Sequence, residues 1–290
     1  MLINSAVNTG CSNPAGYLEK HLTVPPLFLT AVCSVVFLFL AASDIFADEG
    51  IFSDASCKSD FYHEQAVVKK IIDGDTIILA DKRHIRLIGI NTPEINHETG
   101  VSQPGAEVAR DYLSRLLHPD TQIHLVYDKQ RKDRYRRTLA HLFLQNGINV
   151  QSRMLSRGLA TSLTIPPNTG FLECYASSML HARSGHIGLW AMKQYQPRPA
   201  GTISRDMLGY RLVTGRVTRV TRSKSTTWIN LDDRVAVRIS RQDVDNFDKA
   251  QLATLEGSDL LVQGWLYYLN GEYRMRIRHP VDIIMPANRN

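Results

Sequence analysis

The pattern of hydrophobic and polar residues predicts two groups of short strands in this chain. Each group contains five strand-like runs bounded by turn residues, and the runs of the second group show the period-two pattern that is typical of half-buried strands. The first group is expected at residues 66–72, 76–80, 85–90, 123–127 and 139–144. The second group is expected at residues 213–220, 228–231, 235–239, 260–266 and 273–277.

Apolar residues at helical spacing predict helices after the third and fifth strand patterns. One pattern covers residues 109–117, a second covers 150–155 and is closed by Gly158, and a third covers 172–179. The second group has one possible helix at 244–255, before its fourth strand. The chain is therefore expected to be α+β and mainly β. Five strands with one helix favour a second small β-barrel, although other five-stranded antiparallel folds fit the same pattern.

An apolar segment near the N-terminus predicts export. Residues Pro25–Ala42 carry no charge, Lys20 precedes them and Asp44 follows them. The length lies between a signal-peptide core and a short membrane span, and Ala41-Ala42-Ser43 offers small residues for cleavage. We expect a signal peptide or an uncleaved signal anchor, with the rest of the chain outside the cytoplasm; a buried core helix is the weaker alternative.

These patterns divide the chain into five parts. Residues 48–62 are polar and read as a tether, and the run from Gln194 to Gly201 is a proline-rich linker. The expected parts are a signal peptide or anchor (1–47), a tether (48–62), a first domain (63–193), a linker (194–206) and a second domain (207–290).

Cysteine usage predicts one disulfide. Cys11 and Cys33 belong to the targeting region, which leaves Cys57 and Cys174 in the exported part. Two cysteines in an oxidising compartment favour a bridge between them, with two buried thiols as the alternative.

The charge balance favours an anionic partner. The formal net charge is +6 at pH 7, which suits nucleic acid or a membrane surface, although many basic proteins bind neither.

Three motifs in the first domain carry candidate chemistry. They are Asp73-Gly74-Asp75-Thr76, the run from Arg86 to Glu94, and Asp133-Arg134-Tyr135-Arg136-Arg137. Taken singly, they are typical of a hairpin turn, a helix start and a solvated basic loop. In this order, with a strand between each pair, they supply two arginines, two carboxylates and a carboxamide. That combination suits a hard cation with oxygen ligands beside a bound phosphodiester.

The three motifs resemble those of the staphylococcal nuclease (thermonuclease-like) family, over about residues 65–190. The resemblance implies a five-stranded barrel of the oligonucleotide-binding (OB) type with about three helices. It also implies a calcium ion, a general base and two arginines that grip the phosphate. The residues implied are Asp75, Asn91 and the Thr92 carbonyl as calcium ligands, Glu94 as the base, Arg86 and Arg137 on the phosphate, and Arg134 and Tyr135 on a neighbouring phosphate.

Three departures from the family pattern change the expectation. Asn91 stands where the best-known members have aspartate, so we expect weaker calcium binding. Arg136 replaces a glycine; if that position has a positive φ, arginine costs roughly 1 kcal/mol of strain, or it adds a phosphate contact. The tyrosines that stack near the substrate base in the best-known members are absent around 163–165.

The second domain shows no catalytic motif. Arginines such as Arg274 and Arg276 alternate along its strand patterns with aromatic residues such as Trp228 and Tyr273. Basic groups among aromatics suit single-strand binding, but a merely solvated sheet face has the same pattern.

The sequence therefore predicts an exported, monomeric, calcium-dependent nuclease that cleaves DNA and RNA and favours single strands. A membrane contact is expected only through an uncleaved N-terminal anchor. One alternative is a nuclease-like scaffold that binds nucleic acid without cutting it. Another is a membrane-anchored surface protein whose barrels bind protein or polysaccharide.

Overall fold

The computed structural model describes residues 57–96, 98 and 100–284. The predicted targeting segment Pro25–Ala42 and most of the tether lie outside these residues. Among the residues that are described, no helix has the length and apolar character needed to span a membrane.

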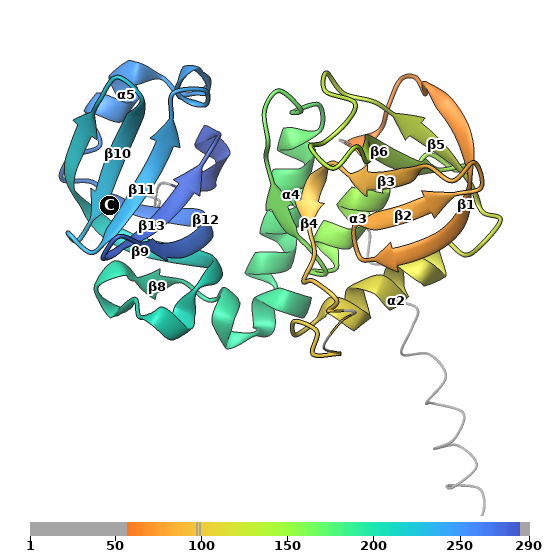
Figure 1. Ribbon diagram of the computed structural model, residues 1–290, viewed down its shortest axis with the longest axis horizontal. Helices are drawn as coiled ribbons and strands as arrows, with labels where there is room; N and C mark the ends of the chain where they lie inside the picture. The colour runs from red at the N-terminus through yellow and green to blue at the C-terminus, as the bar shows by residue number, and fades with distance from the viewer. Residues whose placement is uncertain (1–56, 97, 99, 285–290) are drawn as a thin grey trace, which may run out of the picture. The chain divides into compact units, whose positions relative to one another are not determined.

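Five strands of the first domain form a closed barrel (Figure 1). Strands β3 and β6 pair in parallel, and the other neighbours pair antiparallel. Side chains on alternate positions, such as Ile77, Ile85 and Leu142, point into the core and are fully buried. The barrel strands are β1 (Glu64–Asp73), β2 (Thr76–Leu79), β3 (His84–Leu87), β5 (Gln122–Val126) and β6 (Thr138–Leu144).

The predicted strand at 85–90 is wrong in one respect, because the chain breaks there into two strands. Strand β4 (Gly89–Asn91) leaves the barrel and pairs with β7 (Thr161–Leu163), an element that the pattern did not predict. Gly89 has a φ of 84°, and a Cβ at this position would lie 2.5 Å from the Tyr175 ring. Glycine therefore permits both the change of direction and the close approach of Tyr175.

Three helices accompany this barrel, as the spacing predicted. Helix α2 (Ala106–Leu116) lies beneath the barrel in Figure 1 and packs on β1. Helix α3 (Val150–Ser156) packs on α4 (Leu172–Ser184). The Asn149 side chain caps α3 by accepting a hydrogen bond from the Ser152 N–H, and Gly158 follows the helix with a φ of 62°.

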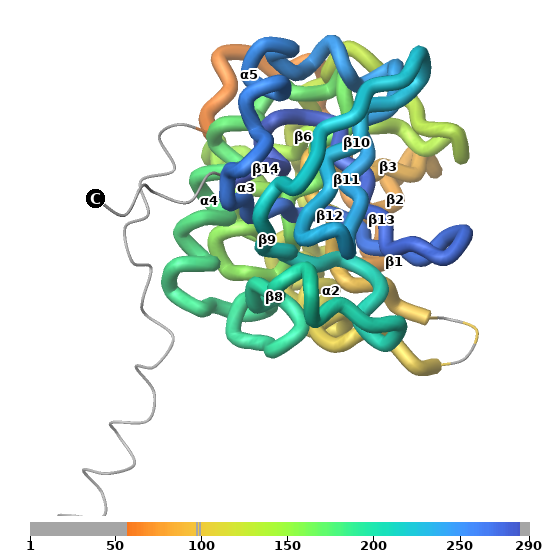
Figure 2. The backbone as a smooth tube through the Cα atoms, turned by 90° about the vertical axis from the view of Figure 1, so that its left-hand side faces the viewer, coloured from red at the N-terminus to blue at the C-terminus, as the bar shows by residue number. Residues whose placement is uncertain are grey.

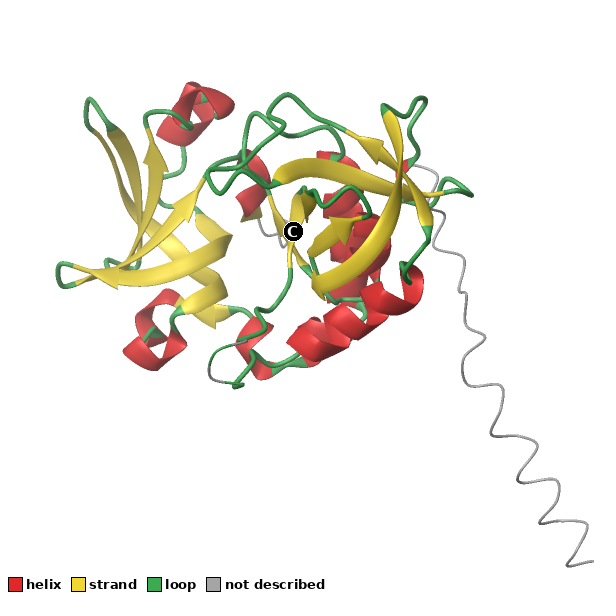
Figure 3. Cartoon of the chain, turned by 45° about the vertical axis from the view of Figure 1, so that its right-hand side comes forward, coloured by secondary structure: helices red, strands yellow, loops and turns green. Residues whose placement is uncertain are grey.

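The second domain is a β domain in which strands predominate (Figure 3). Its strands β9, β10, β11, β13 and β12 are neighbours in that order, and β12 also pairs with β9, so the five close into a ring. The parallel pair β11–β13 corresponds to β3–β6 of the first barrel, so both rings follow the same order of pairings. Figure 2 shows β9, β10 and β11 running side by side. The bounds are β9 (Gly209–Arg222), β10 (Thr226–Leu231), β11 (Val235–Ser240), α5 (Lys249–Ala253), β12 (Asp259–Leu269), β13 (Glu272–Ile277) and β14 (Ile283–Ile284).

Short elements occupy the predicted linker and the remaining turns. Ala200 and Ile203 are buried within the segment 194–206, whose limits stay a prediction. The short elements are the 3-10 helices η2 (Gly188–Ala191), η3 (Lys193–Tyr195), η4 (Ala200–Thr202), η5 (Arg205–Met207), η6 (Val244–Asn246) and η7 (Pro280–Asp282), and strand β8 (Arg198–Pro199).

A disulfide joins Cys57, ahead of β1, to Cys174 in α4. Their Cα atoms lie 5.4 Å apart, and both residues are buried. The bridge ties the end of the tether to α4, the last α-helix of the first domain.

Candidate active site

One cleft of about 450 Å³ gathers the predicted site residues at one end of the first barrel. Thr92 lies next to this set and is buried, whereas Cys57 and Cys174 lie elsewhere in the core. The predicted residues that line the cleft are Asp75, Arg86, Asn91, Glu94, Arg134, Tyr135 and Arg137.

The turn between β1 and β2 places Asp75 in this cleft. The Asp75 N–H donates a hydrogen bond of 3.1 Å to Asp73 Oδ1, which tightens the turn. A Cβ on Gly74 would lie 2.7 Å from the Thr92 side chain, so glycine lets the turn pack against Thr92. The Asp75 side chain is consequently almost fully buried, at 6% exposure.

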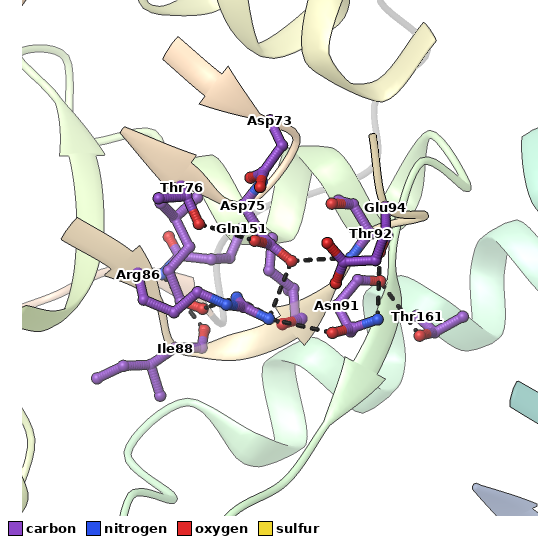
Figure 4. A network of polar contacts seen from close by, with 12 residues as sticks. Asp73, Asp75, Thr76, Arg86, Ile88, Asn91, Thr92, Glu94, Gln151 and Thr161 are labelled. Atoms are coloured by element: carbon purple, nitrogen blue, oxygen red, sulfur yellow. Dashed lines mark hydrogen bonds and ion pairs between the residues drawn. The ribbon is translucent and has the colours of Figure 1, made fainter. Parts of the chain in front are cut away.

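Arg86, on β3, reaches from the barrel to two of the predicted metal ligands (Figure 4). Its Nη2 lies 2.9 Å from Asp75 Oδ2 and 3.1 Å from Asn91 Oδ1. Its Nη1 donates to the carbonyl oxygens of Leu87 and Ile90, at 2.7 and 3.0 Å. These four contacts fix the guanidinium in one orientation.

The segment after β4 carries the other oxygen groups. The Thr92 N–H donates to Asp75 Oδ2 at 3.0 Å, and Asn91 Nδ2 donates to the Thr92 carbonyl at 3.2 Å (Figure 4). The Glu94 N–H donates to Gln103 Oε1 at 3.1 Å. Gln103 was not predicted as a site residue, and its only sequence signal is its place in the loop that follows Glu94.

Burial and a neighbouring carboxylate raise the pKa values of two acidic side chains at this end of the barrel. Burial, followed by the negative charge of Asp75, raises the pKa of Asp73 to about 6. The same two causes raise the pKa of Glu94, while Arg86 and Arg137 oppose the shift. A carboxylate with a raised pKa is a better proton acceptor near neutral pH.

Asp133 organises the basic loop between β5 and β6. Its Oδ1 accepts hydrogen bonds from the N–H groups of Tyr135 and Arg137, both at 2.9 Å. Its Oδ2 accepts from Arg137 Nε at 2.7 Å, which orients this guanidinium. Asp133 was not predicted as a site residue; its signal in the sequence is an aspartate at the first position of a turn.

Arg136 occupies a left-handed position in the same loop. Its φ is 67°, and its N–H donates to the Asp133 carbonyl at 3.0 Å. A type I turn followed by a left-handed residue is a common hairpin connection that favours glycine at the last position. Arg136 therefore has the positive φ at which a residue other than glycine is strained, and the backbone strain is roughly 1 kcal/mol.

Arg134 and Tyr135 lie on the rim of the cleft. Arg134 Nη2 donates to the Tyr135 hydroxyl at 2.7 Å, and the guanidinium carbon lies 4.7 Å from the ring centre. Arg137 lies 5.5 Å from the same ring centre. Leu163 and Ile165 line another part of the cleft, where the sequence lacked the tyrosines of the best-known family members.

The oxygen groups of the cleft fit a hard cation. Among the described residues, no three Asp, Glu, His or Cys side chains form a metal-binding cluster. The predicted calcium ligands differ from such a cluster because they combine one carboxylate (Asp75) with an amide (Asn91) and a backbone carbonyl (Thr92). Asp75 Oδ2 and Asn91 Oδ1 both lie within 3.1 Å of one cationic nitrogen, Arg86 Nη2, so the two oxygens already face a common positive charge. Such oxygen donors are what Ca²⁺ accepts.

Comparison with known proteins places the first domain in a family. Residues 84–192 match the model of the staphylococcal nuclease homologue family. The chain is 31% identical to the thermonuclease of Staphylococcus intermedius over 175 residues, which cover 59% of this chain and 98% of the relative. It is 29% identical to the thermonuclease of Staphylococcus hyicus over 177 residues, with coverages of 60% and 99%. It is also 30% identical to Endonuclease YncB of Bacillus subtilis over 131 residues, with coverages of 43% and 61%. The match to the Staphylococcus intermedius thermonuclease covers nearly the whole of that relative at 31% identity. Together with the barrel and the cleft, this match shows that the chain belongs to the staphylococcal nuclease family.

Proposed function

We propose that this nuclease hydrolyses DNA and RNA with the help of a calcium ion, outside the cytoplasm and as a monomer. One observation carries the proposal. A single cleft holds a carboxylate that can act as a base, one arginine from strand β3 and one from the loop before β6, and the oxygen groups of Asp75 and Asn91.

The residues divide the chemistry of hydrolysis between them. Glu94 accepts a proton from the attacking water, whose oxygen forms a bond to phosphorus. The bond from phosphorus to the leaving oxygen breaks, and that oxygen takes up a proton from solvent. Arg86 and Arg137 neutralise the charge on the phosphoryl oxygens, and their fixed orientations reduce the reorganisation needed in the transition state. Arg134 and Tyr135 contact a neighbouring phosphate at the rim.

Asp75, Asn91 and the Thr92 carbonyl would hold the calcium ion. When bound, the ion supplies positive charge next to the phosphate and makes a coordinated water more acidic. The amide of Asn91 contributes an oxygen without a negative charge, so the site is expected to bind calcium more weakly than a site with two carboxylates.

Export and the preference for single strands depend on other observations. The disulfide between Cys57 and Cys174 is typical of proteins outside the cytoplasm. The open cleft at the end of an OB barrel suits an unpaired strand, because such barrels bind backbone phosphates in a basic groove.

The proposal is tested by incubating the exported protein with single-stranded and duplex DNA and RNA, in calcium and in excess chelator. We expect cleavage of all four substrates in calcium, with single strands cut faster, and little cleavage in chelator. Full activity in chelator, or activity with zinc only, would refute the calcium assignment. A protein that binds these substrates and never cuts them would be the non-catalytic scaffold.

We expect Asn91→Asp to lower the calcium concentration for half-maximal rate by about threefold to tenfold, because affinity follows the charge of the ligands. The measurement is initial rate against free calcium. Asn146→Asp, which adds the same charge at an exposed turn of this domain, is the control. Equal calcium dependence in wild type and Asn91→Asp would show that Asn91 is not a ligand.

A further inference from the structure

A second cavity lies beside the proposed active-site cleft, on the other side of the basic loop. It has a volume of about 570 Å³, within the range of about 300–1,000 Å³ that is usual for ligand sites. We call it the outer basic pocket. Its lining residues are Lys82, Arg83, His84, Tyr127, Arg131, Lys132, Tyr135, Arg136, Arg137 and Thr138.

The outer basic pocket is positively charged and its walls hold no carboxylate. Arg83 is paired with Glu64 and Asp81, and Arg137 with Asp133. In contrast, within the described parts of the chain no carboxylate forms an ion pair with Lys82, Arg131, Lys132 or Arg136. Four cations without acidic partners around one cavity favour an anionic occupant.

Two residues connect this pocket to the cleft. Tyr135 and Arg137 line both cavities, so the loop that carries the second phosphate-binding arginine forms their common wall. Tyr135 is 64% exposed at this boundary. A polyanion that occupies the cleft would therefore meet the outer basic pocket as its next site.

Arg136 provides an independent reason to assign a role to the pocket. It occupies a left-handed position at which glycine would be free of strain. The side chain is exposed and lines the outer basic pocket. Arginine at this position therefore adds a cation to the pocket at the cost of backbone strain that glycine would avoid.

From these observations we propose that the outer basic pocket is a subsite for the substrate strand, in which Arg136, Lys132 and Arg131 bind a phosphate of a nucleotide beyond those held in the cleft. The proposal rests on the proposed nuclease function, and it adds a strand subsite on the far side of Tyr135. The chain then binds a longer segment of nucleic acid than the cleft alone would hold.

The test compares long and short substrates. The specificity constant kcat/KM is measured for a single strand of about 16 nucleotides, the upper site size of one OB barrel, and for a dinucleotide. We expect Arg136→Gly to lower the ratio of kcat/KM for the long strand to kcat/KM for the dinucleotide about fivefold at ~0.1 M salt. The slope of log binding constant against log salt concentration should also become shallower, by the amount that corresponds to about one phosphate contact. Lys132→Gln should shift the ratio in the same direction, and it introduces no backbone change.

Matched controls separate a subsite from a general loss of charge or of folding. Arg115→Gln removes one exposed cation from α2, away from both cavities, and should leave the ratio unchanged. The melting temperature of Arg136→Gly should equal or exceed that of wild type, because glycine adopts this φ without strain.

A wild-type ratio of the two constants in both Arg136→Gly and Lys132→Gln would overturn the subsite. If these variants with an unchanged ratio also lost inhibition by inorganic phosphate, the pocket would be a site for free phosphate. This result is not confused with failure of the proposed function, because in that case the wild-type protein would cleave neither substrate.

Discussion

Replacing Glu94 with glutamine is expected to lower the rate of phosphodiester cleavage by about 10²–10⁴-fold, the usual contribution of a positioned general base. Glutamine keeps the size of the side chain and its place beside Gln103 but cannot accept a proton at neutral pH. The raised pKa of Glu94 supports this role, because partial desolvation and the charge of Asp75 make its carboxylate more basic than an ordinary glutamate. The measurement is kcat on single-stranded DNA at saturating calcium.

Glu98→Gln is the matched control, since it removes the same charge from an exposed position in the same loop, outside the cleft. This control should retain the wild-type rate. Binding of a single strand by Glu94→Gln should also stay close to wild type, because Arg86, Arg134 and Arg137 are intact. A wild-type kcat in Glu94→Gln would remove this residue from the mechanism.

Loss of the disulfide is expected to lower the stability of the protein more than any other change proposed here. Cys57 and Cys174 are 117 residues apart in the chain. For a loop of this length the chain-entropy model predicts that the bridge adds at most about 4–5 kcal/mol to the free energy of unfolding. With measured losses of about 2–5 kcal/mol in other proteins, the melting temperature should fall by about 4–20 °C on reduction. The cleft should keep its residues in place, because neither cysteine lines it.

A double-mutant cycle distinguishes the bridge from the packing of two thiols. Cys57→Ala, Cys174→Ala and the double variant should be destabilised to similar extents if a covalent bond is lost in each. Additive effects would indicate two separate buried thiols. Titration of the denatured, unreduced protein provides a direct check, since two free thiols would end the assignment.

The sequence predicted the two strand groups well, because short hydrophobic runs bounded by turn residues, and period-two alternation in the second domain, report burial directly. It failed at residue 88, where a continuous apolar run concealed a break between two strands. That break depends on Gly89 and the ring of Tyr175, which lies far along the chain, and no local pattern contains such a contact. Strand β7 was missed for a related reason: three residues are too few to show a period.

The candidate site was predictable as a set of residues but not as a network. The motifs predicted Asp75, Arg86, Asn91 and Arg137 as site residues, and all four line one cleft in the folded chain. Asp133 was overlooked because an aspartate before a basic run is usual in turns, and its contact with Arg137 Nε becomes visible only in the folded loop. The outer basic pocket also needed the structure, because its residues come from two separate turns of the barrel.

The shared order of strand pairing has a consequence for how activity arises during folding. In the first barrel the third strand, β3, pairs in parallel with the last, β6, so the barrel cannot close until β6 has been added. Asp75 and Arg86 belong to the local β1–β2–β3 meander, whereas Arg137 immediately precedes β6. The meander can form early from contacts between neighbouring strands, but the parallel pair brings together distant parts of the chain and is slower to form. Arg86 and Arg137, the two arginines proposed to bind the phosphate, therefore come together only at barrel closure. The rate at which nuclease activity returns during refolding would then report the rate of that last step.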